Sequence, residues 1–296
     1  MRIAKLVAIL GAVAAAAGPA MAQGFDGGVP ATWACTGNCG AVAPNGAVAA
    51  SPYGGTMMGY VSSYNGAVGA GQISGISYPA DMVGTAPYLV DGSLLTSATF
   101  SASVGDPLDF YFDYVTSDGS GYPDYAWAAL INTADPSDPV YLFTAATQPS
   151  GDISPGVDLP ANAATLTPAT SGINPGNCTA SNYGHYDDGS ATYTGIPCDG
   201  ATWSPLGQSS SQCFEAGCGS TGWILSTFNI TETGTYELEF GVTNSYDNLY
   251  DSGLAIDGLT VAGQDIVATP EPASMTLFAT GLVGLIPLMR RRARQA

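Results

Sequence analysis

Apolar and polar residues alternate with a period of two at several places in the middle of the chain. In the segment 108–114, one face carries Leu108, Phe110, Phe112 and Tyr114, and the other carries Asp109, Tyr111 and Asp113. The segment 236–242 repeats the pattern, with Glu237 and Glu239 on its polar face. This alternation is typical of a β-strand that has one face in a core and one face in water.

Other short apolar runs, each bounded by Gly, Pro, Asp, Asn or Ser, predict further strands. They cover residues 98–104, 126–131, 140–145, 222–230 and 254–262, with weaker signals at 56–61 and 72–78. Seven or more short strands and little helical periodicity predict an all-β fold, an antiparallel two-sheet β-sandwich of jelly-roll-like form. The segment 147–212 is rich in Pro, Gly, Ser and Thr, so we expect a long insertion that is either functional or partly disordered.

The first 22 residues have the features of a secretory signal peptide. Arg2 and Lys5 precede an apolar run, and Ala20-Met21-Ala22 forms an Ala-x-Ala cleavage pattern. The alternative is a membrane-spanning helix, but the run is short and its exit is rich in small residues. We therefore expect cleavage after Ala22 and an exported domain over residues 23–269.

The C-terminal segment 270–296 has three parts in a fixed order. Pro270-Glu271-Pro272 comes first, an uncharged stretch over 273–289 follows, and Arg290, Arg291 and Arg292 come next. Seventeen residues of helix are about 26 Å long, close to the ~30 Å core of a bilayer, so we expect a transmembrane helix over 273–289. The arginines would then lie on the cytoplasmic side of the inner membrane.

This order of parts resembles a PEP-CTERM sorting tail, which is also labelled an ice-binding protein C-terminal domain. The resemblance implies recognition and cleavage by an exosortase, and then delivery to the cell surface or exopolysaccharide matrix of a Gram-negative bacterium. The alternative is a tail anchor that keeps its helix. The tail carries no implication for ice, because no repeated Thr-x-Thr pattern is visible in the chain.

All six basic residues lie in the two terminal segments. Of the 24 acidic residues only Glu271 lies outside 23–269, so the body carries the other 23 and has no Lys or Arg. A surface of this charge repels phosphate backbones, which excludes nucleic acid as a partner. The carboxylates must be solvated, hydrogen-bonded to backbone N–H groups or neutralised by bound cations.

Six cysteines, an even number, lie in the predicted exported body. In an oxidising compartment they predict up to three disulfides, and the short loops favour the pairs Cys35–Cys39, Cys178–Cys198 and Cys213–Cys218. A zinc site is the alternative, but the spacings lack paired C-x2-C motifs and a nearby His.

The body also resembles one of the NF-type families of PEP-CTERM proteins. The residues that carry this resemblance are the segment Phe110–Trp127, the motif Cys218-Gly-Ser-Thr-Gly-Trp223 and the segment Glu239–Gly258, within a similarity over roughly 95–263. It implies a sandwich domain of unknown function and no defined reaction or ligand.

No catalytic constellation stands out in the body, and we expect no catalytic residue and no enzyme. Its one histidine, His185, lies in a polar loop, no Gly-x-Ser-x-Gly motif occurs, and the cysteines are expected to be oxidised. The alternative is a secreted carbohydrate-active enzyme that uses paired carboxylates such as Asp118 or Asp124. With 23 acids in one domain, however, chance pairs are numerous.

Calcium is the one cofactor hypothesis. Two loops beside predicted core strands offer the oxygen ligands that Ca²⁺ prefers, and their candidate residues are Asp118, Asp124, Asn244, Asp247 and Asp251. Asp187-Asp188 is a weaker candidate. The same residue types also make ordinary turns, which is the alternative.

Glycan binding is a second hypothesis. The loop tyrosines Tyr122, Tyr125, Tyr246 and Tyr250 lie beside the calcium candidates and could stack on sugar rings, whereas aromatics in alternating positions pack in the core. Together these features predict an exported, exosortase-processed, non-enzymatic protein of the cell surface or exopolysaccharide matrix.

Overall fold

The computed structural model describes residues 24–74, 76, 90–148, 151–156, 158–169, 171–185 and 193–267. All of them belong to one compact unit, Ala22–Pro270. The predicted signal peptide, the sorting motif and the helix over 273–289 lie outside the described residues. Within the described part of the chain, no helix has the length and apolar character needed to cross a membrane.

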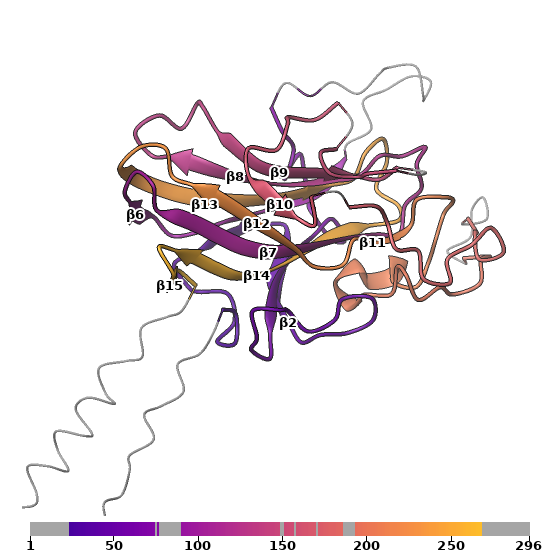
Figure 1. Ribbon diagram of the computed structural model, residues 1–296. Helices are drawn as coiled ribbons and strands as arrows, with labels where there is room; N and C mark the ends of the chain where they lie inside the picture. Colours follow the sequence, from indigo (N-terminus) through magenta and orange to yellow (C-terminus); the bar gives the residue numbers. More distant parts are fainter. Residues whose placement is uncertain are drawn as a thin grey trace, which may run out of the picture. The chain divides into compact units, whose positions relative to one another are not determined.

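The strands of the described residues form two antiparallel sheets that lie as two layers (Figure 1). The first sheet contains β1 (Ala34–Thr36), β4 (Ala67–Val68), β5 (Asp91–Thr96), β6 (Phe100–Ala102), β8 (Tyr125–Asn132), β9 (Val140–Ala146) and β13 (Gly234–Thr243). The second sheet contains β2 (Asn38–Val42), β3 (Met58–Ser62), β7 (Pro107–Thr116), β10 (Thr165–Thr167), β11 (Gly219–Ser220), β12 (Ile224–Asn229), β14 (Ser252–Val261) and β15 (Gln264–Asp265). The prediction of an all-β, two-sheet sandwich is therefore confirmed.

The order of the long strands is that of a jelly roll. The first sheet runs β5-β13-β8-β9 and the second runs β12-β7-β14-β3, and most successive long strands change sheet. In this arrangement β13 and β14 lie at the centre of their sheets, although they come last in the chain. The fold therefore depends on pairing between segments far apart in the sequence.

The core lies between the two sheets and is built by the alternating residues. Leu108, Phe110, Phe112 and Tyr114 of β7 and Leu238, Phe240 and Val242 of β13 are all fully buried. Phe112 stacks on Phe143 of β9 with ring centroids 3.7 Å apart, and Phe110 meets Phe240 edge to face at 5.6 Å. Both ring pairs join one sheet to the other. The apolar residues of the period-two pattern therefore form the contact between the sheets.

The outer face of β7 differs from the expectation that it lies in water. Asp113 is only 1% exposed, and Trp203 and Leu206, the latter in the short 3-10 helix η1 (Ser204–Ser209), pack on the same face of the second sheet. They contact the cluster that includes Ala255, the cross-strand partner of Asp113, and Val115, two residues further along β7. The prediction of a solvated Asp113 was wrong, since segments distant in the sequence pack on this face.

Asp113 gives the fold a pH dependence. Burial raises the pKa of this carboxyl to about 7, although Thr221 donates a hydrogen bond to Oδ1 at 3.1 Å. The raised pKa means that the folded chain holds this proton more tightly than the unfolded chain. Its stabilising contribution is thus complete below the usual value of 3.8 and is lost as the pH rises through about 7.

We therefore expect Asp113→Asn to gain stability relative to the parent chain as the pH rises. Thermal melting of both proteins at pH 5 and pH 8 checks this. The difference in melting temperature, variant minus parent, should be more positive at pH 8. An equal difference at both values would contradict a buried, titrating Asp113.

The insertion 147–212 is more ordered than its composition suggested. Its described residues include β10, which pairs with β12, and η1, which covers β14. The weak strand signal at 72–78 was wrong for residues 72–74 and 76, which form no strand, and the remaining positions lie outside the described residues.

All three disulfides are formed in the favoured pairing, Cys35–Cys39, Cys178–Cys198 and Cys213–Cys218. Their sequence separations are 4, 20 and 5 residues, so each closes a local loop. The Cys178–Cys198 bridge closes the longest of these loops, inside the insertion.

Candidate functional site

Five predicted cation ligands meet at one end of the sandwich. Asp118 follows β7, Asp124 precedes β8, Asn244 and Asp247 follow β13, and Asp251 precedes β14. Antiparallel pairing brings these strand ends to the same edge, where Thr243 faces Tyr125 and Ser252 faces Thr116. We call this group, together with Asp91 at the start of β5, the acidic end.

The carboxylates of the acidic end are close enough to repel one another. Burial, followed by the charge of Asp124, raises the pKa of Asp118 well above its usual value. Burial also raises the pKa of Asp124 well above its usual value, and the charges of Asp247 and Asp251 add to the effect. Asp91 contributes in the same direction to Asp247 and Asp251, and burial raises the pKa of Asp251 to about 6.

These groups are also withdrawn from water. The exposed fraction is 1% for Asp118, 0% for Asp124 and Asn244, and 6% for Asp251. No Lys or Arg exists in the body to neutralise them. A buried carboxylate without a positive partner is costly unless it is protonated, well hydrogen-bonded or bound to a cation.

Hydrogen bonds satisfy part of this need. Asp124 accepts from the Ser245 N–H and from the Ser252 hydroxyl, both at 2.8 Å. The Ser209 hydroxyl donates to Asp251 at 2.6 Å, and the Gly119 N–H donates to Asp118 at 2.6 Å. These bonds orient the carboxylates but bring no compensating charge.

Two neutral oxygens at the acidic end are left unsatisfied. Asn244 donates its side-chain amide to Asp91 Oδ1 at 3.0 Å, but its own Oδ1 is buried and accepts no hydrogen bond within the described residues. The Ser245 hydroxyl beside it is in the same state. A buried acceptor without a donor is uncommon in a native protein, and a bound cation would satisfy it.

The spacing of the acids limits how a cation could be coordinated. Among the described residues, the only group of three or more His, Cys, Asp or Glu whose ligand atoms all lie within 4.8 Å of one another is Cys178, Cys198 and Cys213. These three sulfurs are in disulfides and are not ligands. A Ca²⁺ ion here would thus contact at most two carboxylates directly, and oxygens such as Asn244 Oδ1 would complete its shell.

Two acidic residues of this region were missed by sequence reasoning. Asp91 begins a strand of Gly, Ser, Leu and Thr that shows little alternation, so nothing in the pattern placed it at the acidic end. Glu215 lies between Cys213 and Cys218, and its charge adds to the raised pKa of Asp118. The short disulfide loop around Glu215 was the one feature of the sequence that could have drawn attention to this residue.

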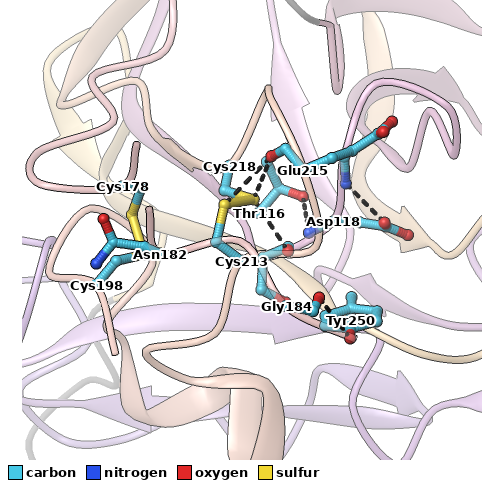
Figure 2. The surroundings of a disulfide bond; sticks show 12 residues. Thr116, Asp118, Cys178, Asn182, Gly184, Cys198, Cys213, Glu215, Cys218 and Tyr250 are labelled. Carbon is cyan, nitrogen blue, oxygen red and sulfur yellow. Dashed lines mark hydrogen bonds between the residues drawn. A yellow bond between two sulfur atoms is a disulfide. The ribbon is translucent and has the colours of Figure 1, made fainter. Parts of the chain in front are cut away.

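Figure 2 shows how this loop reaches the acidic end, with Glu215 and the Cys213–Cys218 disulfide beside Asp118. The Gly121 N–H donates to Glu215 Oε1 at 2.7 Å. A Cβ at Gly119 would run into the Glu215 side chain, so glycine is required for this close approach.

The four loop tyrosines are not equally available. Tyr125 is 1% exposed and Tyr250 is 4% exposed, and each hydroxyl is engaged with the backbone, at Ile73 and Gly184 respectively. The prediction that these two offer a sugar-stacking surface was wrong, because both rings are packed inside. Tyr122 and Tyr246 are partly exposed, and their rings meet edge to face with centroids 6.1 Å apart. The centroid of the Phe214 ring lies 5.4 Å from that of Tyr122.

A second aromatic surface lies on the outer face of the first sheet, in a groove of about 520 Å³ that includes Trp127, Tyr141 and Glu239. Trp127 is only 5% exposed, and its indole N–H donates to the Gly71 carbonyl at 2.7 Å. Of these three side chains, Tyr141 and Glu239 are therefore the more accessible.

The remaining candidates, His185 and Asp187-Asp188, belong to the insertion 147–212. His185 is exposed in a loop whose backbone pairs with Thr194, and Asp187-Asp188 lies outside the described residues. The structure thus concentrates the predicted chemistry at the acidic end.

Comparison with known proteins adds little to this geometry. No family model matches the chain, and no curated protein matches it. Among solved structures, the K3 cleaved adhesin domain of Lys-gingipain from Porphyromonas gingivalis W83 aligns at 10% identity and a TM-score of 0.33, covering 81% of this chain and 95% of that one. The K1 cleaved adhesin domain of the same protein aligns at 10% identity and 0.30, covering 80% and 97%.

Proposed function

We propose that this chain is an exported, non-enzymatic protein of the bacterial cell surface or exopolysaccharide matrix. Its sandwich is stabilised by Ca²⁺ at the acidic end, and the partly exposed aromatics beside that end bind polysaccharide. The signal peptide directs export, and the tail over 270–296 holds the chain in the inner membrane until an exosortase cleaves it.

Export is supported by the terminal segments and by the chemistry of the body. The Pro270-Glu271-Pro272 motif, the apolar stretch and the arginines resemble the sorting tail in all three parts. The body is cross-linked by three disulfides, which persist in oxidising compartments outside the cytoplasm.

The calcium site is the part of the proposal that the geometry supports best, and one observation carries it. The buried Asn244 Oδ1 accepts no hydrogen bond within the described residues, and it lies among carboxylates that have no basic partner. A hard divalent cation resolves both problems, because it takes neutral oxygens and carboxylates together.

Polysaccharide binding is supported by Tyr122, Tyr246 and Phe214. These rings are partly exposed beside the acidic end, and Tyr122 contacts both Tyr246 and Phe214 edge to face, so the group offers apolar ring surface to a sugar. The alternative of a carbohydrate-active enzyme is less well supported, because Asp118 and Asp124 are 1% and 0% exposed and a sugar cannot reach them.

Cosedimentation of the full chain with the exopolysaccharide of its own bacterium tests the proposal. Combined Tyr122→Ala and Tyr246→Ala changes should abolish binding. Phe100→Ala, a partly exposed ring on β6 at the opposite end of the sandwich, should leave it intact. Loss of binding in Tyr141→Ala alone would place the sugar in the groove instead. Hydrolysis of the polysaccharide that is lost in Asp124→Asn would favour the enzyme.

A further inference from the structure

Asp257 is a buried carboxylate that the acidic end does not explain. It lies in the middle of β14 on the outer face of the second sheet, opposite Tyr111 of β7. Its exposed fraction is 1%, and neither of its oxygens has a hydrogen-bond partner within the described residues. A buried carboxylate with two unsatisfied oxygens is costly, and a bound cation would both satisfy the oxygens and balance the charge.

The segments around Asp257 carry further carboxylates and other oxygen-bearing side chains. Burial raises the pKa of Asp257 to about 6, and the charges of Asp26 and Asp265 add to this effect. The Ser51 hydroxyl and the Gly258 N–H act in the opposite direction, although neither forms a hydrogen bond of ordinary geometry with the carboxylate. The body has no Lys or Arg side chain that could neutralise these charges.

The N-terminal segment is pressed directly against this carboxylate. A Cβ at Gly24 would run into Asp257 Oδ1, and Gly24 adopts a φ of +51°, which favours glycine. The Gly24 N–H donates to Asp265 Oδ2 at 2.8 Å, and the Tyr53 hydroxyl reaches the same oxygen at 3.3 Å. Asp26 is held nearby, since the Thr56 and Met57 N–H groups donate to its Oδ1 at 2.5 and 3.0 Å.

A β-bulge in β14 lies directly beside Asp257. The register of β14 against β7 shifts between Asp257 and Thr260, and Gly258 in that bulge has a φ of +65°. The bulge brings Gly258 of β14 against the Tyr53 ring, whose hydroxyl donates to Asp265. Bulges often re-aim a side chain towards a functional position.

We propose that Asp257 anchors a second Ca²⁺ site, which Asp265 or Asp26 and neutral oxygens from the 24–26 and 51–57 segments complete. Because Asp26, Asp257 and Asp265 do not all come within 4.8 Å of one another, the ion contacts no more than two of them directly. The ion would tie the start of the body to its last two strands. This site is separate from the acidic end and does not depend on it.

The number of Ca²⁺ ions bound by the full-length chain, purified in mild detergent, tests this site. Native mass spectrometry and calorimetry both give this number. The parent chain should bind two ions. Asp257→Asn should bind one, Asp124→Asn should bind one, and the double variant should bind none. Two ions on Asp257→Asn would overturn the second site, and so would a parent chain that binds a single ion which Asp124→Asn removes.

Terbium provides an independent readout if Asp257→Asn does not fold. Tb³⁺ replaces Ca²⁺ and emits when a nearby tyrosine is excited, and Tyr53 lies beside this site, against Gly258 and Asp265. Tyr53→Phe should therefore lower the emission while the count of bound Ca²⁺ stays at two. Unchanged emission from Tyr53→Phe would contradict an ion at Asp257.

Discussion

Asp124→Asn is expected to weaken the response of this protein to calcium, because the ion at the acidic end is lost. In millimolar Ca²⁺ the variant should melt below the parent chain, because one of the carboxylates that hold the ion is gone. Ligand binding to the native state adds about 2.7 kcal/mol when the ligand is at 100 times its Kd. For a chain of this size that is a fall of roughly 5–10 °C in melting temperature.

The result in chelator distinguishes a cation site from a merely structural role of Asp124. Without an ion, the buried charge of Asp124 lies near Asp118, Asp247 and Asp251 and opposes folding. The asparagine keeps an acceptor for the Ser245 N–H and removes that charge, so the variant should be no less stable than the parent chain. Equal destabilisation with and without calcium would show that Asp124 acts only through its hydrogen bonds.

Asp138→Asn is the matched control for this experiment. It makes the same chemical change at an exposed position in the turn between β8 and β9, at the opposite end of β8 from Asp124. Its melting temperature should rise with Ca²⁺ as that of the parent chain does. A loss of the calcium response in this variant would point to a diffuse effect of total charge.

Phe112→Ala is expected to cause the largest loss of stability that does not depend on calcium. Phe112 is fully buried and stacks on Phe143 across the two sheets, so alanine would leave a cavity in the centre of the core. Changes of this kind cost about 3–5 kcal/mol. Urea denaturation should show a lower midpoint with an unchanged slope, equally in calcium and in chelator.

Val104→Ala controls for the general effect of shortening an apolar side chain. Val104 is 64% exposed, and its truncation should change the free energy of unfolding by no more than about 0.5 kcal/mol. If Phe112→Ala were equally mild, the stacked ring pair would not be the contact that holds the sheets together.

The alternating strands could be predicted because their signal is local. β7 and β13 carry the full period-two pattern within one segment, and both have the expected core residues. Short disulfide loops could be predicted for the same reason. β1, β2 and β5 were missed because small and polar residues dominate them, and they are held by neighbouring strands more than by their own side chains.

The site could be predicted only in part, because its assembly is non-local. The two acidic loops were identified from composition, and the jelly-roll order then brought Asp91 to the same end from a strand without a clear signal. Asp113 was expected in water because nothing near it in the sequence shows that Trp203 packs on the same face, in a cluster with Val115 and Ala255. Asp257 was hidden inside an apolar run, and only the structure shows that Gly24 and Asp265 meet there.

At the acidic end, we expect a bound cation to balance the buried negative charge. Melting of the full chain in millimolar Ca²⁺, compared with melting in chelator, tests that claim most directly. We expect a melting temperature several degrees higher in calcium, with a shift that grows with the calcium concentration. An identical melting temperature in both solutions, over a range of calcium concentrations, would contradict it.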